Sequence, residues 1–101
     1  MRNEYLIRLL RLAEEDLNEI ILFIAQDNPL AAENMANNIE KNIQMLASHP
    51  LLGKVPNESE LAGAGYRYLI VDNYLIFYTI EEETIFVHRI IHGARDYRRL
   101  L

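Results

Sequence analysis

The spacing of hydrophobic residues predicts one strand and two helices in the first half of the chain. Residues 4–10 are expected to form a short β-strand, with Tyr5, Ile7 and Leu9 on one face and with Leu6 and Leu10 flanking Arg8 on the other. From residue 12 the apolar positions recur every three or four residues, so an amphipathic helix is expected over residues 12–26. Asn28 and Pro29 are typical of a helix N-cap and first helical position, and they predict a second, antiparallel helix over residues 29–47.

The second half of the chain predicts a long loop followed by three strands. Residues 48–65 contain two prolines and three glycines without a sustained period, which indicates an ordered loop. Three segments rich in aromatic and β-branched residues follow, separated by Asp72-Asn73 and by Glu81-Glu82-Glu83. These expected strands span residues 66–71, 74–80 and 84–91. The pattern therefore predicts an α+β fold of order β-α-α-β-β-β, with a helical hairpin packed on one face of a small, mainly antiparallel sheet.

The middle strand of the expected meander is apolar on both faces. Helices on one side of the sheet would leave the other face of this strand partly exposed to water. Either the chain's own loop covers that face or a partner does, since exposed apolar patches of this kind usually mark interaction surfaces. We expect the contact to involve Tyr74, Ile76 and Tyr78.

Length and composition narrow the class of protein. A chain of 101 residues, 50% of them hydrophobic, suits a single domain over residues 1–101. The absence of cysteine excludes a disulfide framework, a thiolate metal site and a cysteine nucleophile. No apolar run is long enough to span a membrane and no secretory signal is evident, so a cytoplasmic protein is expected.

Charge is distributed unevenly along the chain. The formal net charge of −5 argues against a broad cationic surface for DNA or membranes, yet residues 84–101 carry +3 and the first 83 residues carry −8. The arginines of this basic segment are Arg89, Arg95, Arg98 and Arg99. Two interpretations remain open: the arginines bind phosphate or carboxylate groups of a partner, or they neutralise the 81–83 turn and the helix acids.

Few residues offer catalytic chemistry. His88 and His92 lie four apart on an expected strand, which separates them by about 13 Å and disfavours a shared metal ion. His88 is expected to be a hydrogen-bonded core residue, whereas His92, at the strand end, is the better candidate for a general acid or base. Arg67 lies within an apolar strand, where an arginine is costly unless it reaches an anion or the edge of the sheet, so a structural and a functional role both remain open. No metal or cofactor is expected.

Several segments together resemble the RelE/ParE superfamily of bacterial type II toxins. The resemblance covers nearly the whole chain. Its segments are the helical hairpin, Pro50-Leu51-Leu52-Gly53, Gly65-Tyr66-Arg67, Tyr74-Leu75-Ile76-Phe77-Tyr78 and Val87-His88-Arg89-Ile90-Ile91-His92-Gly93-Ala94-Arg95-Asp96-Tyr97. The resemblance implies the same β-α-α-β-β-β order, and a toxin that is neutralised by a cognate antitoxin and meets operator DNA only through the antitoxin complex.

The resemblance also implies two alternative activities. RelE-like members cleave messenger RNA on the ribosome, whereas ParE-like members inhibit DNA gyrase by binding. Arg67 matches the family's meander arginine, and Arg95 matches its arginine after the last strand. Glu58 and Glu60 stand where RelE has lysines, and Leu101 stands where RelE has a late tyrosine. Acids in place of cations would repel the scissile phosphate, so the groups needed for RNA cleavage are largely missing.

The first hypothesis is therefore a ParE-like toxin, active in growth inhibition and in plasmid or chromosome maintenance, that inhibits DNA gyrase without catalysis. The target contacts expected on this hypothesis are Arg89, Arg95, Arg98 and Arg99. The antitoxin is expected along the groove between helices and sheet, with contacts at Tyr74, Ile76 and Tyr78. The alternative is a ribosome-dependent endoribonuclease in which Arg67 and Arg95 stabilise the transition state and His92 moves protons. A third alternative is a toxin that has lost its activity and only binds its antitoxin.

Overall fold

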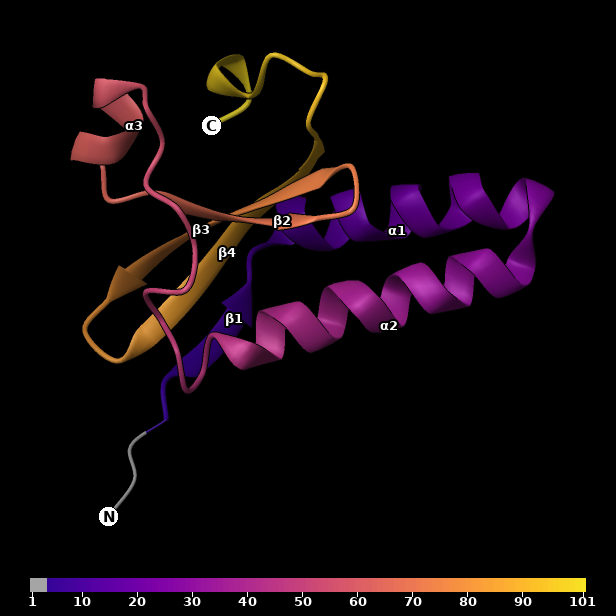
Figure 1. Cartoon of the computed structure of the whole chain (residues 1–101), viewed down its shortest axis with the longest axis horizontal. Helices are drawn as coiled ribbons and strands as arrows, with labels where there is room; N and C mark the ends of the chain where they lie inside the picture. Colours follow the sequence, from indigo (N-terminus) through magenta and orange to yellow (C-terminus); the bar gives the residue numbers. More distant parts are fainter. Residues whose placement is uncertain (1–3) are drawn as a thin grey trace.

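The computed structural model describes residues 4–101, and its main elements follow the predicted order (Figure 1). The elements are β1 (Leu6–Leu9), α1 (Arg11–Asp27), α2 (Pro29–Met45), α3 (Ser59–Gly63), β2 (Arg67–Val71), β3 (Tyr74–Glu81), β4 (Thr84–His92) and the 3-10 helix η1 (Tyr97–Arg99). The sequence pattern did not predict α3, which lies inside the expected loop, or η1, which lies inside the polar tail. The predicted α+β order is confirmed.

The sheet has four strands in the order β1-β4-β3-β2. β2, β3 and β4 form the predicted antiparallel meander, while β1 pairs in parallel with β4. The meander turns contain Asp72, with a φ of 53°, and Glu82, with a φ of 56°. Asp tolerates this left-handed region better than most residues, which supports the turn predicted from Asp72-Asn73.

The two long helices form a hairpin with a single residue between them. The Asn28 side chain accepts a hydrogen bond from the Ala31 N–H at 3.0 Å, and Pro29 occupies the first turn, so the predicted cap is present. The hairpin packs on one face of the sheet. Its buried residues, together with those of the sheet face that it covers, are Ala13, Ile39, Ile43, Leu46, Leu69, Val71, Ile76, Tyr78, Ile85, Val87 and Ile90.

A β-bulge interrupts the pairing of β3 with β4. Phe77 pairs with Arg89 and Tyr78 pairs with Val87, so His88 is an extra residue in β4. A bulge bends the strand and redirects the side chains around it. Val87 and Ile90 consequently both belong to the helix-side core although they are three residues apart.

The sheet face away from α1 and α2 is also covered. Phe77, in the middle of β3, has no exposed surface. Its ring centroid lies 6.4 Å from that of Tyr66, 5.6 Å from that of Tyr68 and 5.0 Å from that of Tyr97. Tyr97 belongs to η1, and Figure 1 shows this C-terminal turn and α3 on the side of the sheet opposite the long helices.

Of the two alternatives left open for β3, the chain's own residues rather than a partner cover its second face, so the expectation that β3 offers an apolar surface to a partner is wrong. Ile76 and Tyr78 are fully buried in the core shared with the helical hairpin, where the segment at Gly53 also lies against the Tyr78 ring, and Tyr74 packs against the same core. These residues are not placed to form the predicted antitoxin surface. The two-residue period of the strand indicated two apolar faces but gave no sign that the tail would fold back over one of them.

Candidate functional site

The C-terminal tail, residues 93–101, carries three exposed arginines. After β4 the chain turns, with the Arg95 N–H donating to the His92 carbonyl at 3.0 Å, and then forms η1. Arg95, Arg98 and Arg99 are exposed. Arg98 lies 3.6 Å from Asp96, but the two side chains are 64% and 53% exposed, so this pair contributes at most about 1 kcal/mol. The three guanidinium groups are therefore accessible to an anionic partner.

Arg89 has a different environment from the other three arginines. Its guanidinium donates to both carboxylate oxygens of Asp16 in α1, at 2.7 and 2.9 Å, and to the Leu100 carbonyl at 3.1 Å. The Ile90 N–H also donates to Asp16, at 2.9 Å. The hydrogen bond to Asp16 raises the pKa of Arg89. Because the side chain is only 15% exposed, the prediction that Arg89 contacts the target is corrected: it joins α1, β4 and the tail.

Tyr97 anchors the tail to the sheet and to the segment before α3. Its ring packs on Phe77, and its hydroxyl donates to Glu58 Oε2 at 2.8 Å. This hydrogen bond lowers the pKa of Glu58 and raises the pKa of Tyr97. The sequence analysis assigned no role to Tyr97 and noted Glu58 only as an acid in place of a lysine. The two residues are 39 positions apart, so no local pattern could have paired them.

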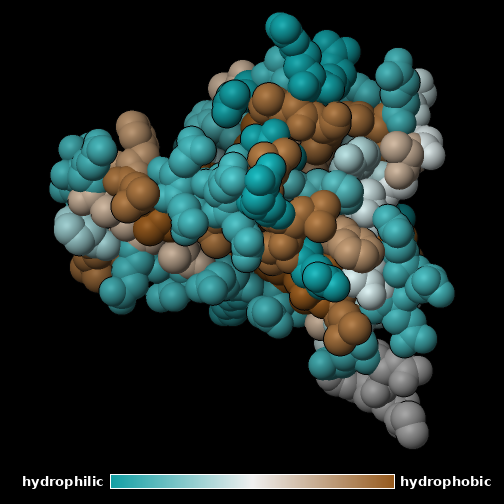
Figure 2. Space-filling model, turned by 180° about the vertical axis from the view of Figure 1, so that it is seen from behind, coloured by the Kyte–Doolittle hydropathy of each residue, from teal (hydrophilic) through white to brown (hydrophobic). Residues whose placement is uncertain are grey.

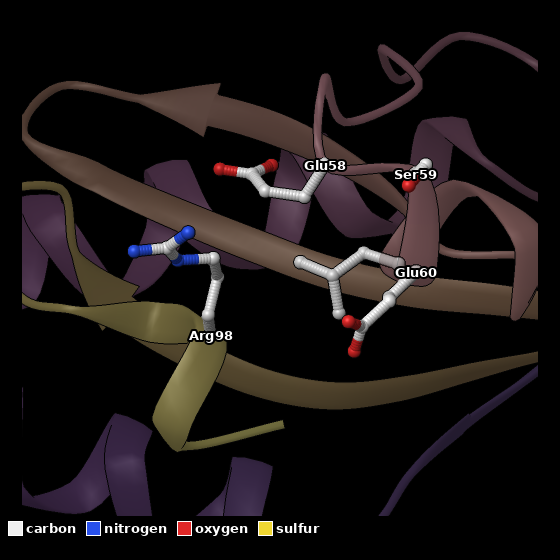
Figure 3. Close-up of a pocket in the computed structure, with 5 residues that line it drawn as sticks. Glu58, Ser59, Glu60 and Arg98 are labelled. Atoms are coloured by element: carbon white, nitrogen blue, oxygen red, sulfur yellow. The ribbon is translucent and has the colours of Figure 1, made fainter.

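A pocket of about 270 Å³ lies beside this contact, lined by Glu58, Ser59, Glu60, Leu61 and Arg98. Figure 3 shows the Arg98 side chain extending from the tail toward the side on which the Glu58 carboxylate lies, while the Glu60 carboxylate points elsewhere. Arg98 further lowers the pKa of Glu58 through its positive charge. The pocket thus combines two acids with one cation, which does not suit a phosphodiester.

Arg67 fills a structural role at the edge of the sheet. Its guanidinium donates to the backbone carbonyls of Gly53 at 2.9 Å and Leu51 at 3.3 Å. Next to it, the buried Tyr78 hydroxyl donates to the Pro50 carbonyl at 2.7 Å and accepts from the Gly53 N–H at 2.9 Å. Burial raises the pKa of Tyr78. Of the two interpretations of Arg67, the structure supports the one in which it holds the loop against β2 and β3.

The residues considered for RNA cleavage do not converge. The sheet register pairs Arg67 with Tyr78 and His92 with Tyr74, so four residues of β3 separate the two sites, or about 13 Å along the strand. His92 is exposed, and its Nδ1 accepts from the Ala94 N–H at 3.1 Å. Since Arg95 follows this turn, it lies at the His92 end of the sheet, away from Arg67.

His88 is a hydrogen-bonded residue of the covered sheet face, as predicted. Its Nε2 lies 2.8 Å from Thr79 Oγ1, and its ring meets the Tyr66 ring edge-on at 5.0 Å. Burial lowers its pKa, so the neutral ring is favoured. Within residues 4–101 no group of three or more His, Asp or Glu side chains is arranged to hold a metal ion. No helix in the same residues is long and apolar enough to cross a membrane.

An apolar groove runs between the start of α1, β4 and the last residues of the chain. Its volume is about 400 Å³, and its lining is Leu10, Arg11, Leu12, Tyr66, His88, Arg89, Leu100 and Leu101. Leu6, Leu10 and Leu12, in and beside β1, are 68%, 37% and 45% exposed. Seen from behind, the molecule carries a band of hydrophobic surface from its upper middle down toward the N-terminal end (Figure 2). The sequence analysis did not identify this groove.

The fold of this chain, a helical hairpin on a sheet of order β1-β4-β3-β2, is shared with solved chains from two toxin-antitoxin systems. The family model described as the ParE toxin of the type II toxin-antitoxin system parDE matches residues 7–97. The chain belongs to this family of toxins.

Relatives from both branches of the superfamily are similar to this chain. Toxin RelE2 of Caulobacter vibrioides is 36% identical over 81 residues, which cover 79% of this chain and 85% of the relative. A chain of the chromosomal ParDE system from P. aeruginosa superimposes with a TM-score of 0.75 at 17% identity, covering 88% of this chain and 96% of that one. A chain of the toxin-antitoxin complex RelBE2 from Mycobacterium tuberculosis gives 0.62 at 24% identity, covering 88% and 98%. The two structures share the fold.

Proposed function

We propose that this toxin inhibits DNA gyrase by binding through its cationic tail, that this inhibition arrests growth, and that a cognate antitoxin neutralises it. The observation that carries the proposal is the dispersal of the cleavage groups. Arg67 is engaged by the carbonyls of Leu51 and Gly53, and His92 lies at the other end of the sheet. A general acid or base must reach the same reacting atoms as the groups that stabilise the transition state, and His92 lies beside Arg95 but away from Arg67.

The charge beside the tail also favours binding over RNA cleavage. Glu58 and Glu60 line the pocket that Arg98 borders, and the pKa of Glu58 is lowered, so its carboxylate is ionised at neutral pH. Two carboxylates at this position repel an approaching phosphodiester. A protein target that offers carboxylates to the arginines, away from the pocket, meets no such repulsion.

Arg95, Arg98 and Arg99 are the proposed target contacts. They are exposed, and Arg95 and Arg99 border a shallow hollow of about 320 Å³ together with Asp96 and Leu100. A hollow with two guanidinium groups suits a planar carboxylate, which can accept paired hydrogen bonds. Arg89 is left out of this set because Asp16 already occupies its donors.

The antitoxin is proposed to dock on the groove beside β1 and the start of α1 rather than on β3. The similar solved chains come from ParDE and RelBE2 toxin-antitoxin systems. In this chain the exposed Leu6, Leu10 and Leu12 provide an apolar surface at the edge strand of the sheet. This position differs from the predicted groove between helices and sheet, and it replaces Tyr74, Ile76 and Tyr78 as contacts because those residues belong to the core.

An RNA-cleaving function is the second candidate, favoured by the 36% identity to Toxin RelE2 and by the exposed His92 beside Arg95. Two assays on one purified sample separate the candidates: supercoiling of relaxed plasmid by bacterial gyrase, and the integrity of a message during cell-free translation. Our proposal expects blocked supercoiling and intact messages, with His92→Ala as active as the wild type. Cuts in the translated message with normal supercoiling would overturn it.

A further inference from the structure

We propose that Glu58 and Tyr97 form a latch that positions the tail arginines for contact with the target. The inference rests on one part of the proposed function, which is that the tail of the toxin contacts the target. It concerns a hydrogen bond between two residues that themselves need not touch that target. The two residues are positioning residues, and their effect on the target passes through Arg95, Arg98 and Arg99.

Tyr97 is attached to the body of the protein at two points. Its ring lies 5.0 Å from the ring of the fully buried Phe77, and its hydroxyl donates to Glu58 at 2.8 Å. The first contact places η1 above the middle of β3. The second fixes the rotation of the tail about that point, because Glu58 belongs to the segment that enters α3 on the same side of the sheet.

The Glu58 carboxylate depends on Tyr97 in turn. Its Oε1 is buried and has no hydrogen-bond partner among the described residues, whereas its Oε2 accepts from Tyr97. A hydrogen bond to a charged acceptor is about twice as strong as one between neutral groups. The lowered pKa of Glu58 keeps that charge at neutral pH. The hydrogen bond from Tyr97 to Glu58 is therefore charge-assisted.

A second anchor holds the end of the tail. The Arg89 guanidinium, itself fixed by Asp16, donates to the Leu100 carbonyl at 3.1 Å. Arg98 and Arg99 lie between Tyr97 and Leu100, so the chain on both sides of them is held while their own side chains stay exposed. Fixing the backbone before association reduces the entropy that binding must otherwise remove.

The test uses Tyr97→Phe, which removes one oxygen and retains the ring on Phe77. Glu58→Gln keeps an acceptor but removes its charge, and serves as a second, milder variant. The matched controls are Tyr68→Phe, in the same aromatic cluster, and Glu60→Gln, in the same pocket. Unfolding midpoints measured on all variants identify any that lose the fold.

The first readout is the rate of trypsin cleavage after the tail arginines, which tracks the population of the released tail. Tyr97→Phe is expected to raise this rate about tenfold, the change given by losing one charge-assisted hydrogen bond at a partly exposed site. Glu58→Gln is expected to raise it less, and the double variant no more than Tyr97→Phe alone. The controls should cleave at the wild-type rate.

The second readout is growth arrest on induced expression, which does not depend on the identity of the target. Both latch variants are expected to need about tenfold more protein for the same arrest, and both controls to match the wild type. Unchanged cleavage rates in the latch variants would overturn the proposal, as would faster cleavage with undiminished arrest. If the wild type arrests growth without inhibiting gyrase, the proposed function fails while the latch is still judged by these two readouts.

Discussion

The hydrogen bonds from Arg89 to Asp16 hold the Arg89 guanidinium inside the protein. Asp16 is one of several acids in the early turns of α1, and the sequence gives no sign that this one faces β4. In the structure Asp16 accepts two hydrogen bonds from Arg89 and one from the Ile90 N–H, with both side chains largely buried at 15% and 12% exposure. The bulge at His88 makes this possible, because it redirects the side chains of β4 near the start of α1.

Asp16→Ala is accordingly expected to lower the free energy of unfolding by about 2–4 kcal/mol, since it leaves a largely buried guanidinium without its carboxylate. Urea denaturation measures the effect. Glu15→Ala is the matched control, because Glu15 is 55% exposed and its ion pair within the described part of the chain is the one with the exposed Arg11 at 3.7 Å; its expected cost is below about 0.5 kcal/mol. Equal costs for the two variants would contradict the role given to Asp16.

His88 gives the protein a pH dependence of definite sign. Burial lowers its pKa from the ordinary value of 6.5, with Glu81 acting in the opposite direction. The unfolded chain therefore takes up a proton at His88 at a higher pH than the folded chain, and the folded state loses stability as the pH falls below 6.5.

We expect His88→Gln to flatten the decrease in unfolding free energy below pH 6.5. Glutamine keeps a group that can hydrogen bond to Thr79 but does not titrate. His49→Gln, at an exposed position in the segment after α2, is the matched substitution for comparison. Denaturation curves over a pH series provide the comparison, and a His88→Gln slope as steep as that of the wild type would contradict this interpretation.

At the scale of elements, the segment between α2 and β2 is fixed to the sheet by a close approach at Gly53. A Cβ at this position would lie 2.7 Å from the ring of Tyr78 and 2.9 Å from the Tyr68 carbonyl. The neighbouring Lys54 pairs with Tyr68 as an isolated β-bridge at the open edge of β2. Glycine is therefore required where the segment passes over the buried tyrosine.

Gly53→Ala is expected to destabilise the protein by about 1–3 kcal/mol, because neither the buried ring nor the backbone carbonyl can move freely. Gly63→Ala is the control: a Cβ there meets nothing within 4 Å, so the change should be neutral or stabilising by up to about 1 kcal/mol. Thermal or chemical unfolding distinguishes the two. Similar stabilities for both variants would mean that the segment is not held tightly against Tyr78.

The elements that the sequence predicted correctly are those specified by neighbouring residues. The helical hairpin follows from a short-range apolar period and from the Asn28-Pro29 cap, and the meander follows from its turns. The contacts that sequence could not supply join distant segments: Asp16 with Arg89, and Glu58 with Tyr97. The cover over Phe77 was missed for the same reason. The sequence also did not show that Ile76 and Tyr78 face the core under the hairpin, on the opposite side of β3.

At the scale of the whole molecule, the helical hairpin is mainly acidic and the C-terminal tail is cationic. All the charged residues between positions 12 and 40 are acidic, so Arg11 and Lys41 are the cations of the long hairpin, while the exposed Arg95, Arg98 and Arg99 lie together on the tail across the sheet. The tail is held by Tyr97 and Leu100 rather than by its own arginines. This arrangement offers an anionic target one cationic surface with a defined shape.

The most direct test of the account is the concentration of toxin that half-inhibits supercoiling by gyrase, measured for the wild type and for the variant in which Arg95, Arg98 and Arg99 are all glutamine. The account predicts inhibition by the wild type and a loss of about tenfold or more in the variant, since each charge-assisted hydrogen bond contributes roughly 1.5–3 kcal/mol. Failure of the wild type to inhibit, or equal potency of the two proteins, would contradict it.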